Sequence, residues 1–210
     1  ALKEIVPADK VLLQEPMKLH TTFRIGGPAD CLVYLENEEQ LCKIQKYLRL
    51  VDVPYTVIGN GSNLLVSDQG YAGIVLVVGK HMSRIEVKDC YLEAEAGALM
   101  SQVAKAAKEH GLTGLEFAAG IPGTIGGGAV MNAGAYGGEM KDVLTSVRVM
   151  TEKGEIMELP AEKLGLGYRT SIIPEKRYIV LGAVISLTEG KKEEIKAQMD
   201  LSLIHISEPT

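Results

Sequence analysis

The sequence predicts an α+β fold built from two units, of which the second is richer in strands. Three observations carry this prediction. The opening third combines short apolar strands with one helical pattern, residues 84–96 and 143–159 each have the pattern of a hairpin, and two glycine-bearing loops interrupt the chain. With 210 residues, 46% of them hydrophobic, the chain has enough apolar material for one large domain or two small cores.

The first unit begins, after a Gly-Gly-Pro turn, with a predicted strand over residues 31–35. Asn37 followed by Gln40 is similar to a capping box and predicts a helix start. The apolar residues of this helix fall on one face: Leu41, Ile44, Leu48 and Val51. Residues 54–58 predict the next strand, and residues 73–78 predict another after the first glycine loop. This order indicates a small α/β unit.

The second unit is predicted to contain two hairpins and one further strand. Residues 84–88 and 91–96 alternate apolar and polar side chains, as do residues 143–151 and 155–159 around a turn at 152–154. Between the hairpins, apolar residues at helical spacing predict a helix with His110 near its end, where the imidazole can meet the last carbonyl groups. Residues 178–187 form an apolar run that predicts a buried strand.

Charge and cysteine usage exclude several classes of function. The net charge of -5, with Lys and Arg spread along the chain, gives no basic surface for nucleic acid or an anionic membrane. Cys31, Cys42 and Cys90 are odd in number and lack C-x-x-C spacing, which disfavours a disulfide framework and a zinc site. No signal peptide or membrane-length apolar run is present. We therefore expect a cytoplasmic protein without a metal.

The first glycine loop directly follows an apolar strand, the usual position of a pyrophosphate cradle. It runs Gly59, Asn60, Gly61, Ser62, Asn63. Leu64 occupies the place of the third glycine in the G-x-G-x-x-G fingerprint, which weakens a Rossmann interpretation. His81 after Gly79 and Lys80 rules out a Walker loop.

The second loop, residues 120–138, is glycine-rich and almost uncharged. Glycines allow close approach of main chain to a ligand, so that N–H groups can bind it. They also allow a helix start to pack closely on a sheet, with Ala129, Val130 and Ala133 as its buried face. The loop alone leaves both explanations open, whereas both loops together favour binding of a large phosphate-bearing cofactor.

Four motifs occur in order: residues 22–28, 58–65, 120–124 with 132–137, and 167–171. Over residues 17–199 the chain resembles the UDP-N-acetylenolpyruvoylglucosamine reductase family, in the shorter form of many Gram-positive bacteria. The resemblance implies an FAD-binding fold of the vanillyl-alcohol-oxidase type, with two α+β subdomains and a third, substrate-binding domain. Here it implies subdomains over residues 1–80 and 81–189, and the start of the third domain over 190–200.

The family's substrate domain is expected to be largely missing, because the sequence changes character after residue 200. Residues 201–210 do not resemble the charged helix and linker expected there, and we hypothesise that they are foreign to the gene. The family's proton-donating serine and its assisting glutamate cannot be placed on this chain. Neither Ser202 nor Ser207 is assigned the role of the serine.

By resemblance, FAD would contact three groups of residues. Its pyrophosphate would be wrapped by Gly59, Asn60, Gly61, Ser62, Asn63 and Leu64. Running along the cofactor would be Pro122, Gly123, Thr124, Gly126 and Gly127. Close to the flavin and pyrophosphate would lie Asn132, Ala133, Gly134, Ala135, Tyr136 and Gly137.

The resemblance also implies the reaction. NADPH reduces FAD, and the reduced flavin converts the enolpyruvyl ether of a UDP-sugar to UDP-N-acetylmuramate for peptidoglycan. Arg169 matches the family arginine that holds the substrate carboxylate, a task suited to guanidinium, which stays charged and can bind bidentately. Outside this motif, a surface ion pair would be the ordinary expectation for it. Tyr168 lines the substrate pocket or packs, and Arg24 is structural or contacts the cofactor.

Two other functions compete with this interpretation. One is an FAD-dependent oxidase of the same fold that acts on an alcohol or hydroxy acid. The other is a module that holds flavin without chemistry, which the expected truncation makes relevant. In each case the partners are small molecules.

Overall fold

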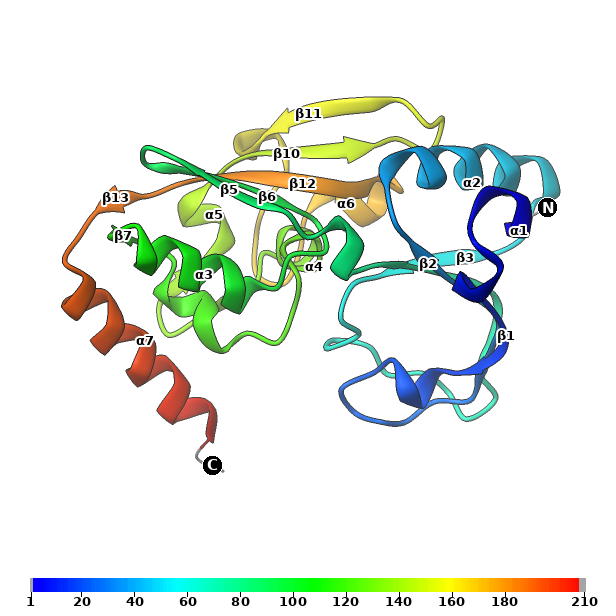
Figure 1. Cartoon of the computed structure of the whole chain (residues 1–210), viewed down its shortest axis with the longest axis horizontal. Helices are drawn as coiled ribbons and strands as arrows, with labels where there is room; N and C mark the ends of the chain where they lie inside the picture. Colours follow the sequence, from blue (N-terminus) through cyan, green and yellow to red (C-terminus); the bar gives the residue numbers. More distant parts are fainter. Residues whose placement is uncertain (1, 208–210) are drawn as a thin grey trace.

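Two β-sheets organise the molecule, one in each half of the chain (Figure 1). The computed structural model describes residues 2–207, and side chains as far as residue 202. The first sheet has the strand order β1-β2-β4-β3 and the second the order β11-β10-β12-β6-β5. The expected α+β fold is therefore present.

The first sheet is mixed. Its strands are β1 (Val11–Pro16), β2 (Pro28–Leu35), β3 (Tyr55–Ile58) and β4 (Tyr71–Val78). β1 pairs antiparallel with β2, whereas β4 pairs parallel with both β2 and β3. Because β3 and β4 are parallel, the chain must cross over between them, and that connection contains the first glycine loop.

Helix α2 (Glu38–Val51) follows β2 and begins at the predicted cap, where the Asn37 side chain accepts a hydrogen bond from the Gln40 N–H at 2.9 Å. Leu41, Ile44 and Leu48 of the predicted apolar face are buried. The prediction is wrong for Val51, which is 39% exposed. The helix ends there, because Asp52 adopts the left-handed conformation at φ 49°.

The second sheet is antiparallel throughout. Both predicted hairpins are confirmed, as β5 (Ile85–Lys88) with β6 (Tyr91–Glu95) and as β10 (Leu144–Met150) with β11 (Ile156–Pro160). The predicted apolar strand is β12 (Ile179–Ser186), which lies between β10 and β6. The last strand of the sheet in the sequence is therefore its central strand.

Three helices, α3, α4 and α7, belong to the second half of the chain. α3 (Met100–Glu109) carries a buried face, and His110 at its end lies with Nδ1 2.9 Å from the Ala106 carbonyl oxygen, as expected. α4 (Ile125–Met131) is formed by the second glycine loop. α7 (Lys192–Ser207) continues past residue 200, and residues 208–210 of the hypothesised foreign tail lie outside the described residues.

Short elements complete the chain. They are α1 (Leu2–Ile5), α5 (Met140–Val143), α6 (Ile172–Glu175), β7 (Leu112–Thr113), β8 (Gly134–Ala135), β9 (Gly138–Glu139), β13 (Thr188–Glu189) and the 3-10 turns η1 (Ala8–Lys10), η2 (Met17–Leu19), η3 (Lys80–Met82), η4 (Glu116–Gly120) and η5 (Ala161–Lys163).

One large cluster of buried side chains extends across both sheets, and a smaller one covers the other face of the first sheet. The continuous apolar cluster fixes the two halves against each other, since its burial is lost if they separate. Within the described part of the chain, no helix combines the length and apolar character that crossing a bilayer requires.

Candidate cofactor cleft

The two glycine loops touch each other. The Asn60 side chain donates a hydrogen bond from Nδ2 to the Pro122 carbonyl oxygen at 2.7 Å. A Cβ atom added to Gly59 would lie 2.3 Å from the Thr124 Oγ1 atom, so only glycine permits this approach. Segments more than sixty residues apart in the sequence thus meet at one junction, which we call the glycine junction and define by Gly59, Asn60, Pro122 and Thr124.

The first loop presents a run of unused main-chain donors. The N–H groups of residues 59–63 donate no hydrogen bond to any described residue. A hydrogen bond fixes the loop to the segment before β2, because the Thr22 N–H donates to the Gly61 carbonyl oxygen at 3.2 Å. Gly61 itself has φ 62°. Consecutive free N–H groups in a fixed loop form a site for an anion such as a diphosphate.

The glycines of α4 divide between the two explanations left open above. A Cβ atom would lie 2.9 Å from Ala96 Cβ at Gly126, and 2.9 Å from Met100 Sδ at Gly128, so these two glycines allow close packing. Gly127 is exposed, and a Cβ atom there would make only an ordinary 3.7 Å contact with Thr124 Oγ1. Gly127 therefore leaves open space on the side of the cavity that it lines.

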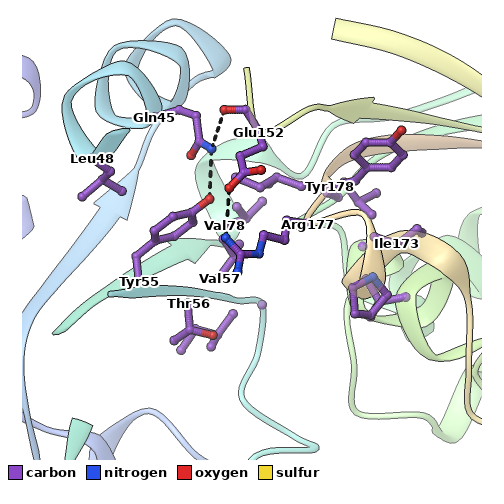
Figure 2. A pocket seen from close by; sticks show the side chains of 18 of the residues that line it. Gln45, Leu48, Tyr55, Thr56, Val57, Val78, Glu152, Ile173, Arg177 and Tyr178 are labelled. Atoms are coloured by element: carbon purple, nitrogen blue, oxygen red, sulfur yellow. Dashed lines mark hydrogen bonds and ion pairs between the residues drawn. The ribbon is translucent and has the colours of Figure 1, made fainter. Parts of the chain in front are cut away.

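A cavity of about 800 Å³ lies between the two halves of the molecule. Its walls include the apolar residues Val57, Val78 and Val180, and one end is formed by Gly59, Thr124, Gly126 and Gly127. Figure 2 shows the polar side chains of the opposite end, Gln45, Tyr55, Glu152 and Arg177. Apolar walls with a few polar groups are typical of cofactor sites.

The polar end of the cavity joins the two halves a second time. The Gln45 Nε2 atom of α2 donates to the Tyr55 hydroxyl oxygen at 2.9 Å and to the Glu152 carbonyl oxygen at 3.3 Å (Figure 2). Nearby, Arg148 of β10 forms an ion pair with Glu38 of α2. The cavity is thus bounded by contacts between the halves at both ends. No sequence motif singled out these residues, because they come from four separated segments.

A second cavity of about 620 Å³ shares Ile58, Gly59 and Thr124 with the first. It is lined by His20, Arg24, Tyr34 and Lys80, among others. The His20 ring lies between Glu15 and Tyr34, with Nε2 2.8 Å from Glu15 Oε1 and Nδ1 3.1 Å from the Tyr34 hydroxyl. Burial, with a smaller effect of Glu15, raises the pKa of Tyr34. Arg24, left open between two roles above, thus lies beside the glycine junction.

Asn132 anchors the turn that carries Tyr168 and Arg169. It is buried, ends α4 at φ 43°, and donates from Nδ2 to Glu139 Oε2 at 2.6 Å and to the Gly167 carbonyl oxygen at 3.0 Å. Its Oδ1 atom accepts from the Lys141 N–H at 2.9 Å. These bonds occupy the whole amide, so the side chain positions the turn.

Tyr168 is 91% exposed, and Arg169 is exposed at φ 55°. Arg169 forms no ion pair with any described residue, so the ordinary surface ion pair is not its role here. Neither residue lines either cavity, and the same holds for residues 132–137. The structure therefore brings together the first two predicted groups of cofactor residues, while the third lies beyond the end of α4.

Comparison with known proteins agrees with this geometry. A family model described as an FAD binding domain matches residues 29–160. The UDP-N-acetylenolpyruvoylglucosamine reductase of Clostridioides difficile is 47% identical over 95% of this chain and 66% of its own length. The enzyme of that name from Agathobacter rectalis is 49% identical over 95% of this chain and 67% of its own length.

Solved structures support the same fold. UDP-N-acetylenolpyruvylglucosamine reductase from Thermus caldophilus superimposes with a TM-score of 0.79 at 36% identity, covering 95% of this chain and 70% of its own. p-Cresol methylhydroxylase, at 16% identity and a TM-score of 0.66 over 90% of this chain and 42% of its own, shares the fold alone. The expected vanillyl-alcohol-oxidase-type FAD-binding fold is thereby confirmed.

The chain spans about two thirds of the length of the curated relatives it matches. The part that the family model matches, residues 29–160, contains both glycine loops and their junction. On this sequence and structural similarity, the chain belongs to the UDP-N-acetylenolpyruvoylglucosamine reductase family and carries an FAD-binding domain.

Proposed function

We propose that this chain is the FAD-binding part of a cytoplasmic enzyme that reduces UDP-N-acetylenolpyruvoylglucosamine with NADPH, for peptidoglycan synthesis. Relatives of that name at 47% and 49% identity support the proposal. The observation that carries it is the glycine junction, where a loop with unused N–H groups meets the second glycine loop beside the cavity between the two halves. Bound FAD would supply the two-electron chemistry, accepting hydride from NADPH and delivering it to the enolpyruvyl group.

The residues present fit FAD. The free N–H groups of residues 59–63 suit a diphosphate, because main-chain donors held in place bind an anion without having to be ordered first. Gly127 leaves room beside them, and the apolar walls that include Val57 and Val180 suit flat rings. The six residues from Gly59 to Leu64 would therefore hold the cofactor, together with Pro122, Gly123, Thr124, Gly126 and Gly127.

Arg169 is proposed to hold the substrate carboxylate and to stabilise the negative charge that develops beside it. Its exposure, its lack of an ion-pair partner among the described residues, and the anchoring of its turn by Asn132 support this role. A guanidinium that no carboxylate of the chain neutralises remains available for that of a substrate. Tyr168 is proposed to contact the substrate beside Arg169, and the 91% exposure of its side chain supports this.

A visible absorption spectrum of the purified chain tests the cofactor directly. We expect the chain to take up added FAD and to keep a flavin spectrum through gel filtration. Protein that cannot be reconstituted with FAD contradicts the proposal. Flavin that is retained while NADPH is not consumed identifies the chain as a cofactor module, and oxygen-driven turnover of alcohols identifies an oxidase.

The role of Arg169 is tested in a full-length relative with the same Gly-Tyr-Arg-Thr-Ser motif. Arg169→Ala should slow reoxidation of reduced flavin by substrate about 100-fold, on the order of a lost charge-assisted interaction, and leave FAD bound. Arg169→Lys is the matched control, which keeps the charge and should recover part of the rate. Reoxidation at the wild-type rate in the alanine variant removes Arg169 from the mechanism.

A further inference from the structure

A hydrogen-bonded triad lies beside the second cavity and has no part in the proposed function. It consists of Glu15, His20 and Tyr34, and the last two line that cavity together with Arg24 and Lys80. We propose that Tyr34 is a nucleophile that acyl phosphates acylate, with His20 as its general base and the two cations binding the phosphate. The inference is independent of the proposed function, because none of these residues lines the larger cavity.

The triad has the order of nucleophile, base and orienting carboxylate. His20 Nε2 lies 2.8 Å from Glu15 Oε1, and His20 Nδ1 lies 3.1 Å from the Tyr34 hydroxyl oxygen. Because a carboxylate only accepts, Nε2 carries the ring proton, and in the neutral ring the lone pair of Nδ1 accepts from the Tyr34 hydroxyl. A nucleophile within hydrogen-bond reach of a base that a third group orients is the arrangement of activated nucleophiles in enzymes.

The base is held in place by its surroundings. Glu15 belongs to β1 and Tyr34 to β2, which pair in one sheet, and the side chains of His20 and Glu15 are only 13% and 19% exposed. The His20 N–H donates to the Met17 carbonyl oxygen at 2.8 Å, and a Cβ atom on Gly61 would overlap the His20 carbonyl oxygen. The ring therefore has little freedom to leave Tyr34, and the geometry exists before a reactant binds.

The Tyr34 hydroxyl needs this base. Burial, with a smaller effect of Glu15, raises the pKa of the hydroxyl above its ordinary value of 10.0. The phenol is therefore neutral near neutral pH and is a poor nucleophile until its proton is removed. His20 Nδ1 can take that proton while the oxygen attacks.

The rest of the cavity favours an anionic reactant. Its volume of about 620 Å³ is that of an ordinary ligand site, and no Asp or Glu occurs among the described residues that line it. Neither Arg24 nor Lys80 forms an ion pair with a described residue. Two such cations beside a nucleophile suit a phosphate leaving group, because they bind its charge. An acyl phosphate joins this leaving group to a carbonyl carbon that a phenol oxygen can attack.

The proposed step is an acyl transfer that needs no oxidant or reductant. Tyr34 Oη bonds to the carbonyl carbon of the acyl phosphate, and its proton moves to His20 Nδ1. The bond between that carbon and the bridging oxygen breaks, and inorganic phosphate leaves with the electron pair and takes the proton from His20. The products are an O-acyl tyrosine and hydrogen phosphate.

Acetyl phosphate is the probe for this reaction. Peptide mass spectrometry of the purified chain after incubation should show an acetyl group on Tyr34. Neutral hydroxylamine should remove it, because hydroxylamine cleaves phenyl esters and not the amides of acetylated lysines. Tyr91 is the internal control, since it is 49% exposed and its hydroxyl has no histidine partner among the described residues, so it should stay unmodified.

His20→Gln tests the base. Glutamine keeps a polar side chain but cannot take the proton, so acetylation of Tyr34 should slow about 100-fold, the contribution of one general base. His110→Gln is the matched control, because His110 lies against the Ala106 carbonyl group outside this cavity and should leave the rate unchanged.

Lys80→Met tests the phosphate contact. It should raise the acetyl phosphate concentration that gives half the maximal rate about tenfold, on the order of one lost hydrogen bond to a charged group. p-Nitrophenyl acetate carries no phosphate, so its reaction with Tyr34 should depend on His20 and not on Lys80.

Three results would overturn the inference. They are acetylation of Lys80 with Tyr34 unmodified, equal rates at Tyr34 and Tyr91, and a wild-type rate in His20→Gln. If His20→Gln does not fold, the comparison of Tyr34 with Tyr91 in the wild-type chain decides alone. FAD binding is measured separately, so each of these results leaves the proposed function standing.

Discussion

Gly59 is the residue at which the two loops depend most on the absence of a side chain. A Cβ atom there would overlap Thr124 Oγ1 at 2.3 Å, and Asn60 beside it bonds to Pro122. A methyl group at this point would force the loops apart and move the free N–H groups of the first loop. The added atom would therefore also disturb the hydrogen bond between Asn60 and Pro122, which joins the same two loops.

Gly59→Ala should therefore weaken FAD binding at least tenfold, by displacing the diphosphate donors. Titration of FAD-free protein with FAD, followed by flavin fluorescence, measures the change. Gly79→Ala is the control, since a Cβ atom there would make only an ordinary 3.7 Å contact with Val77 Cγ1. Equal FAD affinity of the Gly59→Ala protein and wild type would show that the glycine junction does not position the N–H groups that bind the diphosphate.

Glu139 is a residue whose charge supports the Arg169 turn. A hydrogen bond from Lys141, with a smaller one from Asn132, lowers the pKa of the Glu139 carboxyl from its ordinary value of 4.5. A lowered folded-state pKa means that the stabilisation is fully present above the unfolded-state pKa and is lost as pH falls through the folded-state pKa. The carboxyl group is partly exposed to solvent, so the effect is small.

Glu139→Gln should lower the urea midpoint of unfolding at pH 7, and the difference from wild type should shrink as pH falls below about 4.5. Urea unfolding at pH 7, 5, 4 and 3 measures it. Glu189→Gln serves as control, because Glu189 is exposed and forms no ion pair with a described residue. A difference that stays constant across this pH range would contradict the assignment.

Site residues could be predicted from the sequence only where they form local motifs. Gly59 and Thr124 were found because each lies in a run of glycines with a recognisable pattern. Gln45, Tyr55 and Arg177 were not found, because each is an ordinary residue of a helix, strand or turn whose position in the cavity depends on the packing of the two halves. Their place in the cavity can be recognised only once the fold is known.

At the scale of elements, α2 links the two halves of the molecule. Its first turn holds Glu38, which pairs with Arg148, and its middle holds Gln45, which bonds to Glu152. The capping bond of Asn37 fixes where this helix begins and thus where both contacts fall along it.

Asn37→Ala should destabilise the chain by about 1 kcal/mol, the usual cost of a lost N-cap. Urea unfolding followed by circular dichroism measures the loss. Asn37→Asp keeps a side-chain acceptor for the Gln40 N–H and should remain within about 0.5 kcal/mol of wild type. An equal loss in both variants would show that the cap does not hold the helix start.

Elements with local signals were predicted, and those without them were missed. Both hairpins have alternating residues around a short turn, and α2 has its cap and apolar spacing. β1 was missed, since Val-Leu-Leu-Gln-Glu-Pro does not alternate and Gln14 leaves the extended region at φ 50°. For α4 the sequence leaves a helix start open without predicting it, because glycine is a poor helix former.

At the scale of the whole molecule, the cavity lies between two sheets that share one buried cluster. A ligand that contacts both halves stabilises their association, because it binds the folded chain and not the unfolded one. The order of the sheets and the central position of β12 could not be predicted from the sequence, since strand pairing depends on contacts between distant segments.

FAD should therefore raise the thermal midpoint of unfolding and keep a single transition, with a stabilisation of about 2.7 kcal/mol at a concentration 100 times its dissociation constant. Differential scanning calorimetry over a series of FAD concentrations measures this. Riboflavin, which lacks the diphosphate, is the control and should give a much smaller shift. Two separate transitions, of which FAD moves only one, would show that the cofactor does not bridge the halves.

The central place of β12 has a consequence for synthesis on the ribosome. β6 and β10 both pair with β12, whose last residue is Ser186. Until that residue has emerged, the nascent chain holds two hairpins with open edges and no partner between them, a state that is prone to aggregate. The second sheet must therefore wait until β12 has emerged before its five strands can pair.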